Sequence, residues 1–172
     1  RIFFKYKRRL LGSLSHAAVQ ALLKYFQATT STKLRPGVVA CIQTFGDRIN
    51  LHPHIHCLVS EGGEDEQGRF HHVQTFDDSL IAEFFSREVF AFLLGEELIS
   101  EEMVEKILLW RHSGFNVHSR VRCPDGGFYT ISGTSEPPEG FPARLVLFSA
   151  LLDISTCQVL YSLTMGEGKI GA

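Results

Sequence analysis

The chain has 172 residues, of which 44% are hydrophobic and 21% charged, so its composition excludes a disordered or fibrous protein and fits a soluble globular core. The formal net charge is −2 at pH 7, so a nucleic-acid partner would have to be held by a local basic patch. The longest apolar runs are much shorter than the roughly 20 residues of a membrane-spanning helix. The four cysteines are widely separated, which predicts isolated thiols and a reducing, cytoplasmic compartment.

The first part of the chain predicts a strand, a helix and a hairpin. Residues 1–7 alternate in polarity as a strand does, and residues 15–29 place their apolar side chains on one face of a helix that Ser15 would cap. Residues 38–45 and 54–60 are rich in β-branched side chains and are joined by a short polar turn. This pattern predicts an antiparallel hairpin.

The middle of the chain predicts two helices. The acidic segment 61–68 suggests an exposed loop, and residues 69–74 suggest a third strand. Residues 77–95 form the clearest helical pattern, with an aspartate to cap its start and a glycine to end it. A second helix is expected over residues 100–110, where two glutamates in the first turn suit the helix dipole.

The last part of the chain changes in character. Residues 115–122 predict a strand, whereas residues 123–142 are rich in proline and glycine and lack periodicity. Order is expected to resume at Leu145, and residues 157–163 predict a last strand. The fold class that results is α+β, a central antiparallel sheet with helices packed on one side.

Three histidines within five residues form the most informative motif. On a strand, alternate side chains share a face, so His54 and His56 would present two imidazoles side by side, with His52 near the strand start. Two such imidazoles can chelate one cation; the other interpretation is that they are half-buried sheet residues hydrogen-bonded to their neighbours. A third ligand could be Gln43 or Asp47, and we prefer Gln43 because a strand holds it more firmly.

A second metal motif competes with this one. His54, His56, Glu61 and Gly68 have the spacing of the cupin metal motif, which would make the protein a small-molecule metalloenzyme. Arg48 stands where that motif has its first glycine, and two well-defined helices fit an eight-stranded jelly roll badly. This alternative predicts that the Glu61 carboxylate contacts the metal.

Candidate nucleic-acid contacts follow the helix expected over residues 100–110. His112 and His118 flank a glycine turn, and Trp110 and Phe115 offer aromatic faces on which bases could stack. Arg111, Arg120 and Arg122 add cations nearby. The alternative is an ordinary helix-to-strand connection with a buried tryptophan and solvated arginines.

Three stretches together resemble one family. They are PGVVACIQTFGDRINLHPHIHCLVSEGG, WRHSGFNVHSRVRCPDG and, less closely, QVLYSLTMGEGKIG. In this order they are similar to the transposase domain of the rolling-circle, two-tyrosine HUH insertion-sequence transposases, where HUH denotes histidine, a bulky hydrophobic residue and histidine. We therefore expect a single transposase-domain fragment, family-like over residues 1–126 and again over the tail 149–172, with an aberrant segment at 127–148.

The resemblance implies a fold of HUH-nuclease type and a divalent cation, Mg²⁺ or Mn²⁺, held by His54 and His56. It also implies cleavage and strand transfer of single-stranded DNA at insertion-sequence ends through a phosphotyrosine intermediate. Arg111, His112 and His118 would contact that DNA. The expected setting is the bacterial cytoplasm, at the nucleoid when bound to DNA, with neither a membrane nor a small-molecule substrate involved.

One segment departs from the family. Where the family has a helix with its nucleophilic tyrosines, residues 127–148 show no helical pattern, and Tyr129 is the only tyrosine among them. Two interpretations follow. Either Tyr129 serves as the nucleophile of an active transposase, or local scrambling has left a non-catalytic DNA-binding remnant.

Overall fold

The computed structural model describes residues 2–45, 51–110, 114–123 and 142–150. None of the helices in these segments combines the length and the apolar character needed to cross a membrane. In chain order the elements are α1 (Ile2–Tyr6), α2 (Leu10–Thr29), β1 (Val38–Phe45), β2 (Leu51–Ser60), β3 (Gly62–Glu64), β4 (Phe70–His72), α3 (Asp78–Gly95), α4 (Glu101–Leu108), β5 (Phe115–Cys123) and β6 (Ala143–Ala150).

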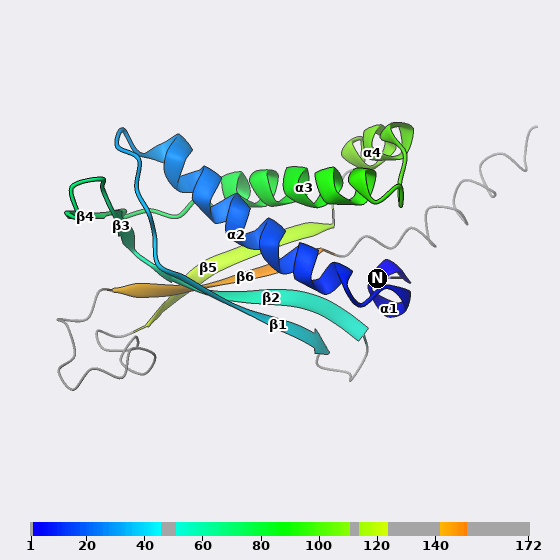
Figure 1. The fold of residues 1–172 in the computed structure, drawn as a ribbon, viewed down its shortest axis with the longest axis horizontal. Coiled ribbons are helices and arrows are strands. Elements are labelled where there is room, and N and C mark those ends of the chain that lie inside the picture. The colour runs from blue at the N-terminus through cyan, green and yellow to red at the C-terminus, as the bar shows by residue number, and fades with distance from the viewer. Residues whose placement is uncertain (1, 46–50, 111–113, 124–141, 151–172) are drawn as a thin grey trace, which may run out of the picture.

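The main sheet has four antiparallel strands in the order β1-β2-β6-β5. Helices α2 and α3 lie side by side over one face of this sheet, and among the described residues no helix covers the other face (Figure 1). The short strands β3 and β4 form a separate two-stranded hairpin beyond one end of the sheet. The predicted α+β architecture, with helices on one side of an antiparallel sheet, is confirmed.

The core lies between the helices and the sheet. On β2, Ile55, Cys57 and Val59 are fully buried under the helices, whereas the residues between them are partly exposed. This alternation follows from the two-residue period of a strand. Across the sheet, Phe85 of α3 makes edge-on ring contacts with Phe115 and Phe148, which fix that helix against β5 and β6. Burial also raises the pKa of the Cys57 thiol to about 12, so this cysteine is an unreactive core residue.

The start of the chain differs from the prediction. Residues 2–6 form the short helix α1 instead of a strand, and α2 begins at Leu10, so Ser15 lies inside that helix and does not cap it. A segment of seven alternating residues can also form a short helix. Burial favours the helix over the strand here, because Phe4, Leu10 and Leu14 extend the apolar stripe of α2 towards the N-terminus.

Most other predicted elements are present with small shifts. The two strands of the predicted hairpin pair antiparallel, although β2 begins at Leu51, three residues earlier than expected. Asp77 caps α3 by accepting hydrogen bonds from two backbone amides, as predicted. The predicted turn at 46–48, the proline- and glycine-rich segment up to residue 141 and the last strand at 157–163 lie outside the described residues.

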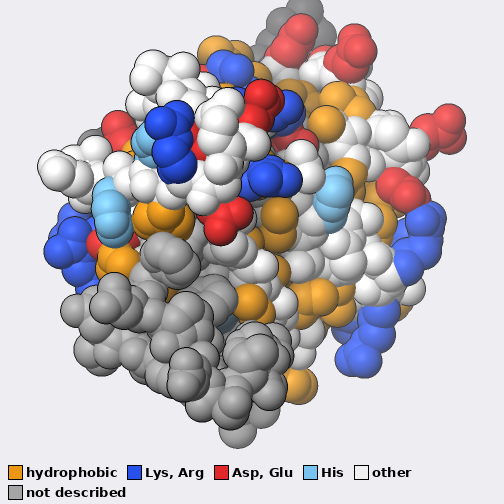
Figure 2. All heavy atoms as spheres, turned by 60° about the vertical axis from the view of Figure 1, so that its left-hand side comes forward, with side chains coloured by type: hydrophobic (Ala, Val, Ile, Leu, Met, Phe, Trp, Pro, Cys, Tyr) orange, Lys and Arg blue, Asp and Glu red, His pale blue; other side chains and the backbone are white. Residues whose placement is uncertain are grey.

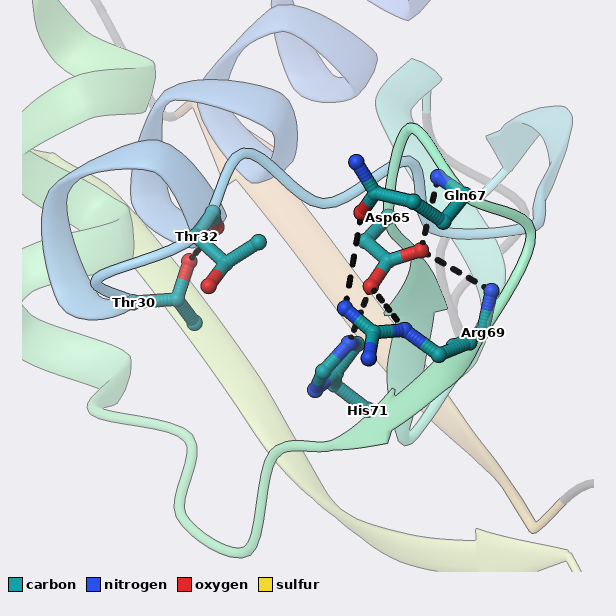
Figure 3. A network of polar contacts seen from close by, with 6 residues as sticks. All are labelled: Thr30, Thr32, Asp65, Gln67, Arg69 and His71. Carbon is teal, nitrogen blue, oxygen red and sulfur yellow. Dashed lines mark hydrogen bonds and ion pairs between the residues drawn. The ribbon is translucent and has the colours of Figure 1, made fainter.

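The acidic segment 61–68 is only in part the exposed loop that the sequence suggests, because residues 64 and 66–68 are exposed whereas Glu61 and Asp65 are buried. Asp65 is fully buried, and its carboxylate accepts hydrogen bonds from the backbone amides of Gln67 and Arg69 at 2.9 Å each, from Arg69 Nε at 3.0 Å and from His71 Nε2 at 2.7 Å (Figure 3). Gly62 is needed here, because a Cβ atom at this position would lie 2.2 Å from the carbonyl oxygen of His71. The expected third strand is therefore β4, which pairs with β3 and not with the main sheet.

We expect this hairpin to lose stability on acidification. The hydrogen bond from His71, supported by the backbone amides of Arg69 and Gln67, outweighs desolvation and holds the pKa of Asp65 well below its usual range. A carboxyl group whose pKa is lowered by folding stabilises the folded state at pH values above its pKa in the unfolded chain, about 4. This contribution is lost as the pH falls towards the pKa that the group has in the folded state. As the pH is lowered from about 6 to about 3, the urea concentration at the unfolding midpoint should therefore fall less steeply for Asp65→Asn than for the unsubstituted chain. Glu66→Gln, which changes an exposed neighbouring carboxylate, is the control, and equal slopes for all three proteins would contradict the prediction.

Candidate functional site

The face of the sheet away from α2 and α3, called the open face from here on, carries three rows of side chains. Each row crosses all four strands, because directly paired residues of antiparallel strands project from the same face. From β1 to β5, the first row is Gln43, His54, Ser149 and Asn116, the second is Cys41, His56, Leu147 and His118, and the third is Val39, Leu58, Leu145 and Val121.

The histidines of β2 lie in line on this face. The ring centroids of His54 and His56 are 4.9 Å apart, and those of His52 and His54 are 5.3 Å apart. His54 Nδ1 lies 2.7 Å from the carbonyl oxygen of His52, so Nδ1 carries the proton and donates it there. This hydrogen bond orients the ring and leaves the lone pair on Nε2, where it is available to bind a metal.

The electrostatics also suit a cation. Burial lowers the pKa of His56, and the neighbouring His54 lowers it further. A histidine with a pKa below its usual value near 6.5 is neutral at pH 7 and keeps a lone pair available for coordination.

A third donor lies directly across the hairpin. Gln43 pairs with His54, and side chains paired in this way have Cβ atoms about 5 Å apart. Cys41, which the sequence analysis did not single out, pairs with His56 in the same manner. Over the described part of the chain, no three or more His, Cys, Asp or Glu side chains are arranged as a metal site. The other candidate, Asp47, lies outside the described residues.

A bulge in β5 shapes the far edge of the open face. The register of β5 against β6 shifts between His118 and Val121. Ser119 turns towards the helices, where its backbone amide and its hydroxyl both donate to Asp78 Oδ1, at 3.1 and 2.5 Å. Arg120 follows this inward residue and is exposed, so the bulge places a guanidinium beside the third row.

The predicted DNA contacts are only partly described. His118 is exposed and shares a row with His56, two strands away and thus about 10 Å distant. Arg111, His112 and Tyr129 lie outside the described residues. Trp110, two residues after the end of α4, is 38% exposed, so the buried tryptophan of the alternative is not observed. The prediction that Phe115 offers a face for bases is wrong, because this ring is buried against Phe85 and Phe90.

Glu61 has a structural role that the sequence did not reveal. Its Oε1 atom accepts hydrogen bonds from Arg122 Nε and Arg144 Nε, both at 2.9 Å. Arg144 also donates from Nη1 to the carbonyl oxygen of Ser119 at 3.0 Å and lies over the ring of Phe76. No local sequence pattern predicts this cluster, because its members come from four separate segments of the chain. Acidic and basic side chains are intermingled on this end of the molecule and do not separate into patches (Figure 2).

This cluster bears on the cupin alternative. The Glu61 carboxylate, which would be the third ligand of a cupin site, forms ion pairs with Arg122 and Arg144. It follows His56 by five residues and lies just beyond the end of β2. The described strands form a four-stranded sheet with helices on one face, whereas a cupin needs a jelly roll. The structure therefore does not support cupin chemistry.

Comparison with known proteins points to transposases. Residues 37–126, just over half of the chain, match the family described as "Putative transposase". This segment contains β1, the histidines of β2 and all of β5. The chain belongs to this transposase family.

A curated relative agrees with this assignment. The transposase for insertion sequence element IS801 of Pseudomonas savastanoi pv. phaseolicola is 42% identical to this chain over 65 residues. The matched segment covers 38% of this chain and 15% of that relative. No solved structure matches the chain.

Proposed function

We propose that this chain is a nuclease domain of HUH type, which cleaves and rejoins single-stranded DNA at insertion-sequence ends. The observation that carries the proposal is the pair His54 and His56 on the open face, opposite Gln43, within the segment that matches the transposase family. Among the described residues no helix covers this face, so an extended DNA strand would have room to lie across the histidines.

The donor set fits a divalent cation. His54 Nε2, His56 and the Gln43 side-chain oxygen would hold it, with open positions left for phosphate oxygens. Imidazole ligands by themselves favour transition metals, whereas the choice of Mg²⁺ or Mn²⁺ follows from the family resemblance. When bound, the cation would polarise the scissile phosphate and stabilise the charge that develops on it.

A tyrosine hydroxyl would provide the nucleophile, and Tyr129 is our candidate. Its oxygen attacks the phosphorus after losing its proton, and the bond from phosphorus to the 3′ oxygen breaks. The products are a 5′-phosphotyrosine on the protein and a free 3′-hydroxyl, which takes up a proton. Because one phosphoester replaces another, a second attack by a 3′-hydroxyl can rejoin the strand without a nucleotide cofactor.

One observation favours a second candidate function, a DNA-binding remnant without cleavage activity. Residues 127–148 contain a single tyrosine and lack a helical pattern, whereas the family resemblance predicts a tyrosine-bearing helix there. The remnant would keep the sheet, the histidines and DNA binding.

A covalent-adduct assay separates these functions. We expect labelled single-stranded oligonucleotides tiled across the element ends, incubated with the protein and Mn²⁺, to give a shifted band on denaturing electrophoresis. The band should disappear in Tyr129→Phe and persist in Tyr6→Phe, which changes a 73% exposed tyrosine of α1. DNA binding without the band would establish the remnant, and the absence of both would overturn the proposed function.

A further inference from the structure

We propose that the third row of the open face, Val39, Leu58, Leu145 and Val121, is a platform for the bases of the bound single strand, with Arg120 beside it holding the backbone. This inference rests on the proposed function and assigns it a base-binding surface. We call these four residues the apolar row.

The apolar row is continuous with the histidine site. On β2, Leu58 follows His56 by two residues, which corresponds to about 7 Å along the strand. A strand of DNA held by a phosphate at the histidines would therefore place its adjacent nucleotides over this row.

The chemistry of the row suits bases better than phosphates. Each strand of the sheet contributes one aliphatic side chain, and the row contains no charged or hydrogen-bonding group. Its two ends are well exposed, with Val39 at 40% and Val121 at 54%. A base can cover such a surface with its apolar face, whatever its identity, so binding here would tolerate many sequences.

Arg120 supplies the charge that the row lacks. The bulge in β5 leaves this guanidinium exposed next to Val121, and no hydrogen bond or ion pair joins it to another described residue. A ligand with apolar faces along one side and negative charges along the other matches this arrangement. Single-stranded DNA has that character.

The size of the row speaks against a protein partner. Four aliphatic side chains, two of them only partly exposed, offer at most a few hundred Å² of apolar surface. A stable dimer needs about 800 Å² from each partner. The row is also one residue wide, and the second row beside it contains the polar His56 and His118, which leaves little room for the apolar side of a second copy.

The test compares oligodeoxythymidine with an abasic strand of equal length, which keeps the phosphates and removes the bases. We expect the 172-residue chain to bind oligodeoxythymidine at least about tenfold more tightly than the abasic strand, because bases that cover the row remove its apolar surface from water. The double variant Val39→Thr with Val121→Thr should weaken binding of oligodeoxythymidine about fivefold and leave binding of the abasic strand unchanged. Threonine keeps the β-branched shape, so the strands should stay folded.

Two control variants sharpen the comparison. Ile42→Thr changes a residue of the same strand that is 39% exposed but pairs with the buried Ile55 on the opposite face, and it should not alter the base preference. Arg120→Gln should weaken binding of both strands alike and reduce the salt dependence by about one phosphate contact.

The outcomes separate this inference from the proposed function. If the chain binds both strands equally, or if Ile42→Thr has the same effect as the double variant, the platform is wrong while DNA binding stands. If neither strand binds, the proposed function fails and the platform with it. A shift from dimer to monomer in sedimentation of the double variant would overturn the inference in favour of an interface between two copies.

Discussion

Replacing Glu61 with alanine is expected to lower the free energy of unfolding by about 3–5 kcal/mol, because it leaves a buried guanidinium without its carboxylate. The Arg144 side chain is only 12% exposed, and two of its nitrogens depend on Glu61. Arg122 is 62% exposed and can turn to water, so it contributes little to the loss. The change should appear as a lower midpoint of urea unfolding with an unchanged slope.

A surface ion pair provides the matched control for Glu61. Glu83 pairs with Arg87 one turn along α3, and both side chains are more than half exposed. Glu83→Ala should therefore change the unfolding free energy by no more than about 0.5 kcal/mol. Glu61→Gln keeps the shape and one acceptor oxygen, so it should fall between the two. Equal effects of Glu61→Ala and Glu83→Ala would mean that the buried cluster does not stabilise the sheet.

Replacing His54 and His56 together with alanine is expected to abolish Mn²⁺ binding and leave the fold in place. Both imidazoles lie on the open face and are only partly buried, so their removal opens no cavity in the core. Loss of both imidazole ligands should weaken Mn²⁺ binding in calorimetry at least about a hundredfold. Thermal unfolding in the absence of metal should shift by only a few degrees.

His118→Ala is the control on the same face. This residue shares a row with His56 but lies two strands away, so its removal should leave Mn²⁺ affinity unchanged. Gln43→Ala, which removes the third donor, should weaken Mn²⁺ binding without abolishing it. Because the pKa of His56 is lowered, its contribution should persist at pH 7 and be lost only on acidification. An unchanged Mn²⁺ affinity in the double histidine variant would remove the proposed metal site.

The sequence predicted the local geometry of the site well. Alternation along residues 54–60 placed His54 and His56 on one face, and the hairpin it predicted brings Gln43 opposite His54. The aspartate before α3 and the glycine at its end predicted that helix correctly. These features depend on side-chain periodicity, capping and short turns, which act between residues close together in the chain.

Charged residues were harder to place. Glu61 and Asp65 belong to a segment that composition assigns to solvent, yet both are buried. Asp65 is paired locally, but Glu61 is compensated by Arg122 and Arg144, which lie about 60 and 80 residues further along the chain. A carboxylate is buried at low cost only when a cation pairs with it. The sequence does not show which distant arginines lie next to Glu61 in the folded chain.

By itself, the sequence determined the α+β class, the paired imidazoles and the resemblance to transposases, which the family match then confirmed over residues 37–126. Only the tertiary structure decided the order of the strands, because β6 inserts between β2 and β5 although it follows both in the chain. That insertion brings His118 and Arg120 onto the face of the histidines and completes the apolar row. The strand that pairs with β2 must both satisfy its backbone hydrogen bonds and help to bury its core-facing side chains. Which distant strand does so depends on the whole fold.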